Sequence, residues 1–222
     1  PLHPSYEDRP GALDRCFAAV DDETYREHVA AWKLALERAG AASADVLHLH
    51  HLTPVNEAAA LAAPGVPIVG HLHGTELMML ERIPAGAPPE WTHAEAWADR
   101  MRRWAQACER LILLSDSQLE RAVAMLAVDP RDCVTIGNGF DAERFQPAAV
   151  DRAAFWRRQL AERPGGWRPG QGAGTIAYGA DEAAALGEGV VLVAVGRFTE
   201  VKRVPLLVAP FERARRGAQP PA

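Results

Sequence analysis

The sequence predicts an α/β fold, with a Rossmann-like parallel sheet that has helices on both faces. Short apolar segments alternate with amphipathic segments from residue 45 onward. Four apolar segments have the length and composition of buried strands, at residues 45–50, 66–72, 111–114 and 133–136. Because strands that alternate with helices form parallel sheets, these segments predict a parallel sheet.

Helices are predicted from capping signals and from the spacing of apolar residues. Pairs of residues with capping-box spacing predict helices that begin at Thr24, Thr92 and Ser117. Gly40 is expected to end the first of these helices. A shorter helical segment at residues 55–63 separates the first two strands. The start of the chain has no strand pattern and is expected to form a loop.

A fifth apolar segment, Val190–Val195, predicts a buried strand that opens a second Rossmann-like domain. Gly196 follows it and allows the backbone to turn sharply. Arg197 and Lys202 can then converge on an anion near the start of the next helix, as in a phosphate site. Pro210 is expected to kink or end that helix.

These elements divide the chain into three predicted parts. Residues 1–150 form a partial N-terminal domain, residues 151–188 an interdomain helix with a Gly/Pro-rich linker, and residues 189–222 the start of a C-terminal domain. A chain of 222 residues with 48% hydrophobic composition can bury one good core, so one domain is expected to be incomplete. Because the sequence begins at Pro1 and not at methionine, we expect a fragment of a longer protein.

Charge and cysteine content narrow the class of protein. The net charge is -5, and cations are interleaved with acids, so nucleic acid is not an expected partner. Three widely spaced cysteines fit reduced packing residues in a cytoplasmic protein better than a disulfide or zinc framework. No apolar run approaches the roughly 20 residues of a spanning helix, so we expect a soluble protein.

The histidines suggest a rival function. His48 with His50, and His71 with His73, each share one face of a strand and could offer two imidazoles to a metal, as in a metal-dependent hydrolase. However, no aspartate follows His51 where such a hydrolase would need a further ligand. We therefore expect no metal at these pairs. His48 and His71 are expected to be hydrogen-bonded interior residues.

Four segments resemble those of family 4 glycosyltransferases, which are retaining enzymes with two Rossmann-like domains, the GT-B fold. The segments are HLHGTE at residues 71–76, LSDS at 114–117, IGNGFDAERFQP at 136–147 and GRFTEVKR at 196–203. Their order and spacing also match the family. One departure is Gly137, which stands where the family usually has proline.

The resemblance implies a hexosyltransferase that moves a sugar from a nucleotide-diphosphate sugar to an acceptor hydroxyl with retention, without a metal or other cofactor. His73 would be the catalytic-site histidine that faces the sugar, and Arg197 and Lys202 would bind the donor diphosphate. The other residues implied to line the cleft are Gly74, Thr75, Glu76, Asn138, Gly139 and Gly196. From the residues alone, Thr75 and Glu76 could equally cap the helix that follows.

Two family motifs are absent from the sequence, the glycine-rich loop of the first domain and the acidic donor-binding motif of the second. We therefore expect the 222-residue chain to be inactive by itself. A non-catalytic sugar-nucleotide-binding module is a further alternative. The expected partners are a nucleotide sugar and a carbohydrate or other hydroxyl acceptor. Since the family often works at a membrane surface, peripheral membrane association is also expected.

Overall fold

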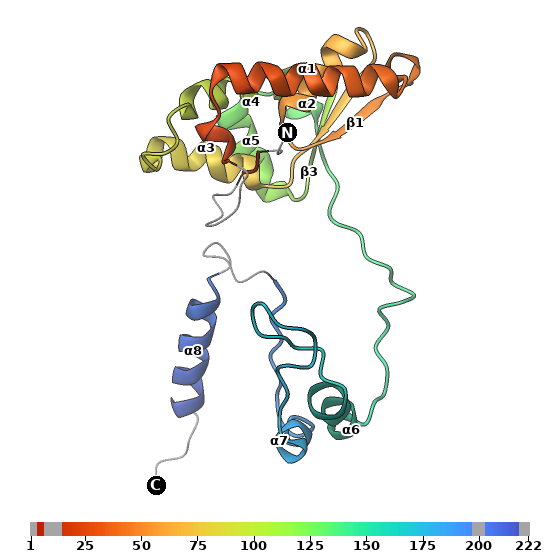
Figure 1. Ribbon diagram of the computed structural model, residues 1–222, viewed down its shortest axis with the longest axis vertical. Coiled ribbons are helices and arrows are strands. Elements are labelled where there is room, and N and C mark those ends of the chain that lie inside the picture. The colour runs from red at the N-terminus through yellow and green to blue at the C-terminus, as the bar shows by residue number, and fades with distance from the viewer. Residues whose placement is uncertain (1–3, 7–14, 197–202, 218–222) are drawn as a thin grey trace. The chain divides into compact units, whose positions relative to one another are not determined.

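The computed structural model describes residues 4–6, 15–196 and 203–217 (Figure 1). The chain divides into two compact units, Pro1–Asp141 and Ala142–Ala222, called here the first and the second unit. Within the part of the chain that the structure describes, none of the helices has the length and apolar character needed to cross a membrane.

The first unit contains a four-stranded parallel sheet in the order β1-β2-β3-β4. The strands are β1 (Leu47–His50), β2 (Ile68–His71), β3 (Arg110–Leu113) and β4 (Cys133–Thr135). Each lies within two residues of its predicted bounds. The predicted parallel sheet and Rossmann-like alternation are therefore confirmed.

Helices precede, link and flank these strands (Figure 1). The α-helices are α1 (Asp22–Arg38), α2 (Pro54–Ala62), α3 (Thr75–Gly86), α4 (Ala94–Gln106) and α5 (Leu119–Leu126). Short 3-10 helices are η1 (Phe17–Ala19), η2 (Ala41–Ser43), η3 (Asp116–Gln118) and η4 (Pro130–Asp132). Right-handed crossovers that step in one direction along a sheet place all their helices on one face. The strand order therefore accounts for a sheet that is covered on one side.

Burial of the strand residues confirms this asymmetry. The covered face carries buried residues of the central strands: Ile68, Gly70, Leu111 and Leu113. The opposite face, called here the histidine face, carries half-buried or exposed residues: His48, His50, Val69, His71, Ile112 and Val134. The prediction of helices on both faces thus differs from the described part of this unit, because the strand order never reverses to send a crossover to the second face.

The core of the first unit lies between the covered face and the helices. Phe17 stacks on Trp97 with ring centroids 4.7 Å apart, and Tyr25 packs edge-on against the same indole. Residues 15–20 carry no strand pattern, but Cys16, Phe17 and Val20 are almost completely buried. The described residues 16–20 of the predicted N-terminal loop are therefore part of the core, which the sequence pattern did not predict.

The predicted helices are present, but the three predicted capping residues are wrong. The helix expected from Thr24 begins at Asp22, and its N-cap is Asp21, whose side chain accepts a bond from Thr24 N. The helices expected from Thr92 and Ser117 begin at Ala94 and Leu119, and the residue before each makes no side-chain capping bond. Apolar spacing places a helix reliably, whereas its first residue depends on local geometry. Gly40 follows the end of α1 with a φ of 77°, as a C-terminal stop requires.

The second unit contains α6 (Arg152–Arg157), the π-helix η5 (Arg158–Glu162), α7 (Ala180–Ala185) and α8 (Val204–Gly217). Within residues 163–174, the predicted linker, there is no helix, and Gly166 forms one isolated bridge with Ile176. The predicted domain bounds stay a prediction.

One prediction for the second unit is wrong, and so is the part of another that expects Pro210 to end the last helix. A kink at Pro210 stays a prediction. Residues 190–195 form no strand, and Val190 and Val195 are 87% and 96% exposed. A strand needs a neighbouring strand to pair its backbone groups, and none of the described residues pairs with this segment. Helix α8 continues through Pro210, so the loss of one backbone donor does not end it.

A prediction follows from the close packing of Gly70 in β2. A Cβ atom on Gly70 would lie 2.9 Å from Cys108 Sγ and 3.0 Å from Leu111 Cδ1, closer than atoms can pack. We expect Gly70→Ala to lower the free energy of unfolding by about 1–3 kcal/mol in urea denaturation. Gly139→Ala is the control, because a Cβ atom there would meet nothing within 4 Å. Equal stability of the two variants would contradict this packing.

Candidate functional site

The carboxyl ends of the four parallel strands lie along one edge of the sheet, called here the carboxyl edge. Open α/β sheets bind their ligands at this edge. His51 follows β1 there, residues 73–76 follow β2, and residues 136–139 follow β4. The segments HLHGTE and IGNGFDAERFQP, far apart in sequence, thus begin at the same edge of one sheet.

Glu76 is the buried centre of this edge. Its side chain is 0% exposed although it lies in the first turn of helix α3. Oε1 lies 2.6 Å from His51 Nδ1, while Oε2 accepts a bond from the backbone N–H of His73 at 3.2 Å. Buried carboxylates need such partners. Glu76 therefore ties the end of β1 to the end of β2.

His51 is held in an unusual backbone conformation. Its φ is 65°, in the left-handed region that residues other than glycine seldom adopt. Its backbone N–H donates to His71 O at 2.9 Å, and its ring packs against His73 with centroids 4.5 Å apart. Together with the Glu76 contact, these interactions hold the strained residue in place. Strained residues of this kind cluster at functional sites.

His73 lies between these groups at the end of β2. Burial lowers the pKa of His73, the neighbouring His51 lowers it further, and the carboxylate of Glu76 opposes both effects. The ring is thus favoured in its neutral form. Its Nε2 lies 2.8 Å from His50 Nδ1, which leaves Nδ1 as the ring nitrogen for a ligand.

Gly74 brings the backbone close to the next strand end. It begins α3 as N-cap with a φ of 91°, and a Cβ atom would lie 3.1 Å from Gln118 Nε2. Both the conformation and the space therefore favour glycine. Helix α3 has Gly74 as N-cap and no side-chain capping bond there, so the alternative in which Thr75 or Glu76 is the N-cap is wrong.

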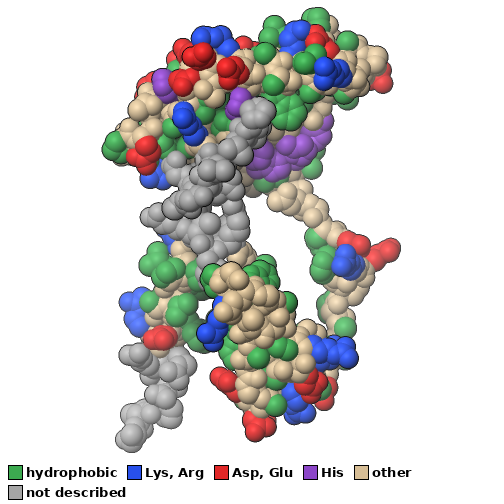
Figure 2. Space-filling model, in the orientation of Figure 1, with side chains coloured by type: hydrophobic (Ala, Val, Ile, Leu, Met, Phe, Trp, Pro, Cys, Tyr) green, Lys and Arg blue, Asp and Glu red, His purple; other side chains and the backbone are tan. Residues whose placement is uncertain are grey.

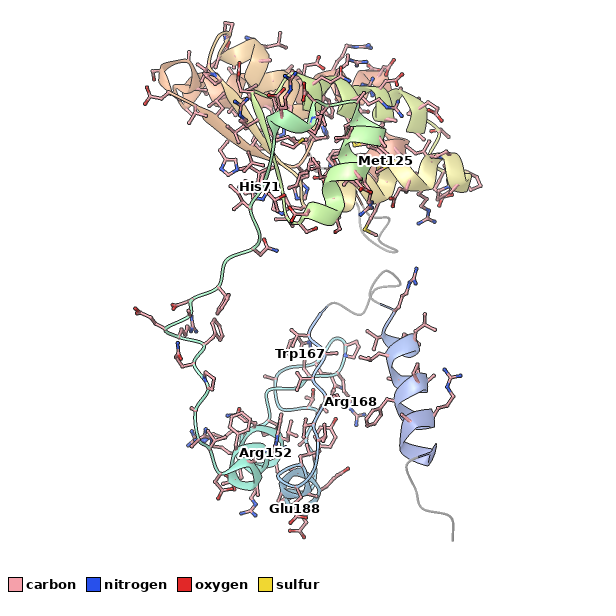
Figure 3. The ribbon with its side chains drawn as sticks, turned by 180° about the vertical axis from the view of Figure 1, so that it is seen from behind. His71, Met125, Arg152, Trp167, Arg168 and Glu188 are labelled. Carbon is pink, nitrogen blue, oxygen red and sulfur yellow. The ribbon has the colours of Figure 1, made fainter. Side chains whose placement is uncertain are left out.

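The histidines of the two strands meet across the sheet. His48 Nε2 lies 3.3 Å from His71 Nδ1, and His50 lies directly opposite His71 in the parallel register. Each of these three residues offers a nitrogen, and the three nitrogens lie within 4.8 Å of one another, so together they could hold a metal ion. Figure 2 shows histidine side chains gathered on the surface of the first unit, and Figure 3 labels His71 among them.

The environments of His48 and His71 differ from the expected interior setting. His48 is exposed, because the histidine face has no cover among the described residues of this unit. His71 is half-buried. Burial lowers the pKa of His71, and the nearby His73, His50 and His48 lower it further. Burial and the crowding of imidazoles thus favour the neutral form of His71.

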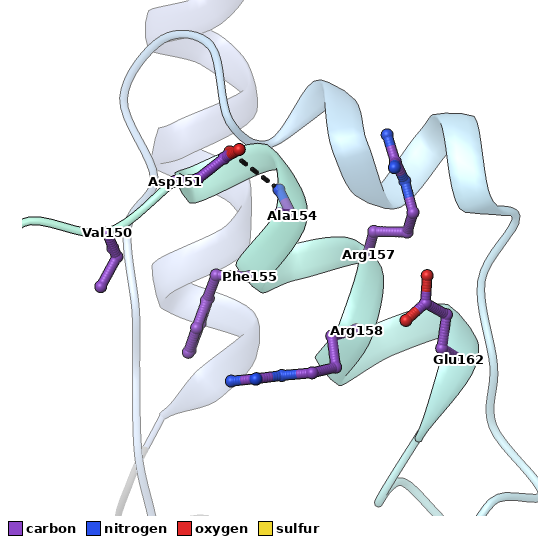
Figure 4. Close-up of a pocket in the computed structure, with 7 residues that line it drawn as sticks. All are labelled: Val150, Asp151, Ala154, Phe155, Arg157, Arg158 and Glu162. Atoms are coloured by element: carbon purple, nitrogen blue, oxygen red, sulfur yellow. Dashed lines mark hydrogen bonds between the residues drawn. The ribbon is translucent and has the colours of Figure 1, made fainter.

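The predicted donor-binding residues are only partly described. Arg197 and Lys202 lie outside the described residues, whereas Gly196 lies in an exposed bend. Asn138 and Gly139 lie in an exposed segment after β4. The second unit also has an open pocket of about 400 Å³ on α6 and η5 (Figure 4), where Asp151 accepts a bond from Ala154 N. Its lining contains none of the predicted site residues.

The model of Glycosyltransferase Family 4 matches residues 5–144. That match spans more than half of the 222 residues and includes the whole sheet and the carboxyl edge. The chain belongs to glycosyltransferase family 4. No curated protein matches this family 4 chain. Membership of this family implies, in general, the binding of a sugar donor and an acceptor.

In this family 4 glycosyltransferase, His73, Gly74 and Glu76 lie at the carboxyl edge directly after β2. Their role as site residues stays a prediction. Sequence reasoning missed the role of His51. Its only signal was its position directly after the strand in HLHH. The partnership of His51 with Glu76 depends on the alignment of two strands, and neither segment shows that alignment by itself.

Proposed function

We propose that this chain is part of a retaining hexosyltransferase that moves a sugar from a nucleotide-diphosphate sugar to an acceptor hydroxyl. Membership of glycosyltransferase family 4 supports transfer in general. The observation that carries the finer proposal is the placement of His73 beside the buried Glu76 at the carboxyl edge. This is the edge where an open parallel sheet binds its ligand.

His73 would contact the transferred sugar in this proposal. A neutral imidazole can accept or donate one hydrogen bond at Nδ1, and the lowered pKa of His73 favours this form. Because Glu76 holds the backbone N–H of His73, the ring is oriented before the sugar binds. Such preorganisation lowers the barrier only if the sugar is held in its reactive position.

The donor diphosphate would be bound by Arg197 and Lys202. Negative charge grows on the diphosphate as the glycosidic bond breaks, so fixed cations stabilise the transition state more than the ground state. Arginine offers a planar fork to two oxygens, and lysine offers a compact charge. With two such cations in place, the proposed transfer uses no metal or other cofactor.

The compartment and partners follow from the same proposal. We infer a cytoplasmic enzyme, because Cys16, Cys108 and Cys133 are free thiols, as expected in a reducing compartment. Its partners would be the nucleotide sugar and a carbohydrate or other hydroxyl acceptor. Peripheral contact with a membrane that carries the acceptor is part of the proposal.

The direct test measures nucleoside-diphosphate release from UDP-, GDP- and ADP-sugars by the complete enzyme of which this chain is proposed to be part. We expect turnover with one nucleotide class, and we expect His73→Ala to lower it by about 10²-fold or more, the range lost with one transition-state hydrogen bond. His93→Ala is the control, since His93 precedes α4 and lies outside the carboxyl edge. Undiminished turnover in His73→Ala would remove His73 from the site. Binding of a nucleotide sugar without any release would favour the non-catalytic alternative.

A further inference from the structure

The histidine face carries a cluster of imidazoles that the proposed transfer does not use. His48 and His50 come from β1 and His71 from β2, and all three project from the same face of the sheet. One ring nitrogen from each lies within 4.8 Å of the other two. We propose that His48, His50 and His71 form a binding site for one divalent cation of the zinc class.

The closest pair already has the spacing of two ligands on one metal. Zinc binds histidine nitrogen at about 2.0–2.1 Å with tetrahedral geometry, which places two ligand nitrogens about 3.3–3.4 Å apart. His48 Nε2 and His71 Nδ1 lie 3.3 Å apart. In contrast, His50 Nδ1 and His73 Nε2 lie 2.8 Å apart, which is a normal hydrogen-bond distance. The separation of His48 and His71 therefore fits two ligands on one cation, whereas that of His50 and His73 fits a hydrogen bond.

The third ligand needs only a small movement. His50 is exposed, so its ring can turn toward the other two nitrogens without opening the core. His71 is half-buried and would contribute Nδ1, the nitrogen that faces His48. Its Nε2 is buried without a hydrogen-bond partner among the described residues and takes no part in the proposed site.

The chemistry of the ligands selects the cation. Three imidazole nitrogens without a carboxylate favour zinc, nickel or copper over magnesium and calcium, which prefer oxygen. Three protein ligands also leave a fourth position for water. Taken strand by strand, His48 pairs with His50 and His71 pairs with His73, so each strand offers only two imidazoles on one face. The parallel register adds His71 to the first pair, because it places His71 opposite His50.

The cation site does not imply a hydrolase. Its ligands lie on the face of the sheet, whereas the proposed transfer involves His73 at the end of β2. We expect the cation to clamp β1 to β2. His50 is the one cation ligand that also contacts the proposed transfer site, because its Nδ1 lies 2.8 Å from His73 Nε2. Zinc titration and nucleoside-diphosphate release measure the two proposals separately, so a failure of one can be told from a failure of the other.

The test is a zinc titration of the metal-free chain in competition with a coloured chelator, with Mg²⁺ as the cation control. We expect one zinc per chain, no Mg²⁺ binding, and at least a tenfold loss of zinc affinity in His48→Gln and His71→Gln. His93→Gln, which lies outside the cluster, should bind zinc as tightly as the unsubstituted chain does. Cobalt should give the intense visible absorption of a tetrahedral site, and His48→Gln should lose it.

His48→Gln decides the outcome if His71→Gln fails to fold, because His48 is exposed and its replacement should leave the core intact. Zinc binding that is absent, or that is equally strong in His48→Gln and His93→Gln, would overturn the proposal. Binding of more than one zinc with weak and equal affinity would overturn it as well, since scattered surface histidines would then explain the titration.

Discussion

Replacement of Arg197 or Lys202 by alanine is expected to lower turnover by about 10²–10³-fold in the complete enzyme of which this chain is proposed to be part. The free energy of unfolding should change little. Turnover should fall because a cation facing the leaving diphosphate gains interaction as charge develops there. Steady-state rates of nucleoside-diphosphate release, compared with urea denaturation of the same variants, check both parts. Lys202→Arg should also be impaired, because a planar fork does not replace a compact charge.

Arg203→Ala provides the matched control for this pair. Arg203 lies one position after Lys202, is exposed, and precedes α8 with a φ of 49°. Its side chain is expected to point away from the diphosphate, so its loss should leave turnover near that of the parent chain. Small and equal effects of all three alanine variants would contradict the phosphate site. The family membership would then stand without an assigned donor site.

The parallel sheet could be predicted from the sequence because each strand is a short apolar run between helices. Which face of the sheet the helices cover could not be predicted. Residues such as His48 and Leu49 alternate along β1, but the pattern does not say which face a crossover helix will cover. That depends on the strand order, and the observed order sends the crossovers to one face.

The segment 190–195 shows a related limit. Its run of valine and leucine is typical of a buried strand, yet it is exposed and unpaired within the described structure. An apolar run favours a buried strand, but a strand also needs a neighbouring strand for its backbone hydrogen bonds. A sequence pattern therefore predicts a strand most reliably where the neighbouring strands belong to the same unit.

The candidate site, too, could be predicted only in part. His73 and Glu76 could be predicted because they directly follow a strand in a motif. The contact between Glu76 and His51 could not, because it requires that β1 and β2 align and that His51 adopt a left-handed backbone. The cation ligands His48 and His71 likewise meet only through this alignment. Local sequence thus placed the residues on their strands, and the register decided which of them meet.

Loss of His51 is expected to destabilise the first unit. His51→Ala should lower the free energy of unfolding by about 1–3 kcal/mol, because it leaves Oε1 of the buried Glu76 carboxylate without its imidazole partner. Oε2 keeps its bond from the backbone N–H of His73. Urea denaturation with unchanged m-values would give this difference.

Two further variants separate the loss of this pair from the simple loss of an imidazole. His48→Ala, measured with a chelator present, removes an exposed imidazole from the same segment and should cost less than about 0.5 kcal/mol. Adding Glu76→Gln to His51→Ala should restore part of the stability, because a neutral amide is less costly to bury than a carboxylate. A double variant no more stable than His51→Ala would instead assign the loss to packing of the His51 ring against His73. In that case Glu76 would serve mainly as an acceptor for the backbone of His73, and the side-chain link between the ends of β1 and β2 would rest on ring contacts.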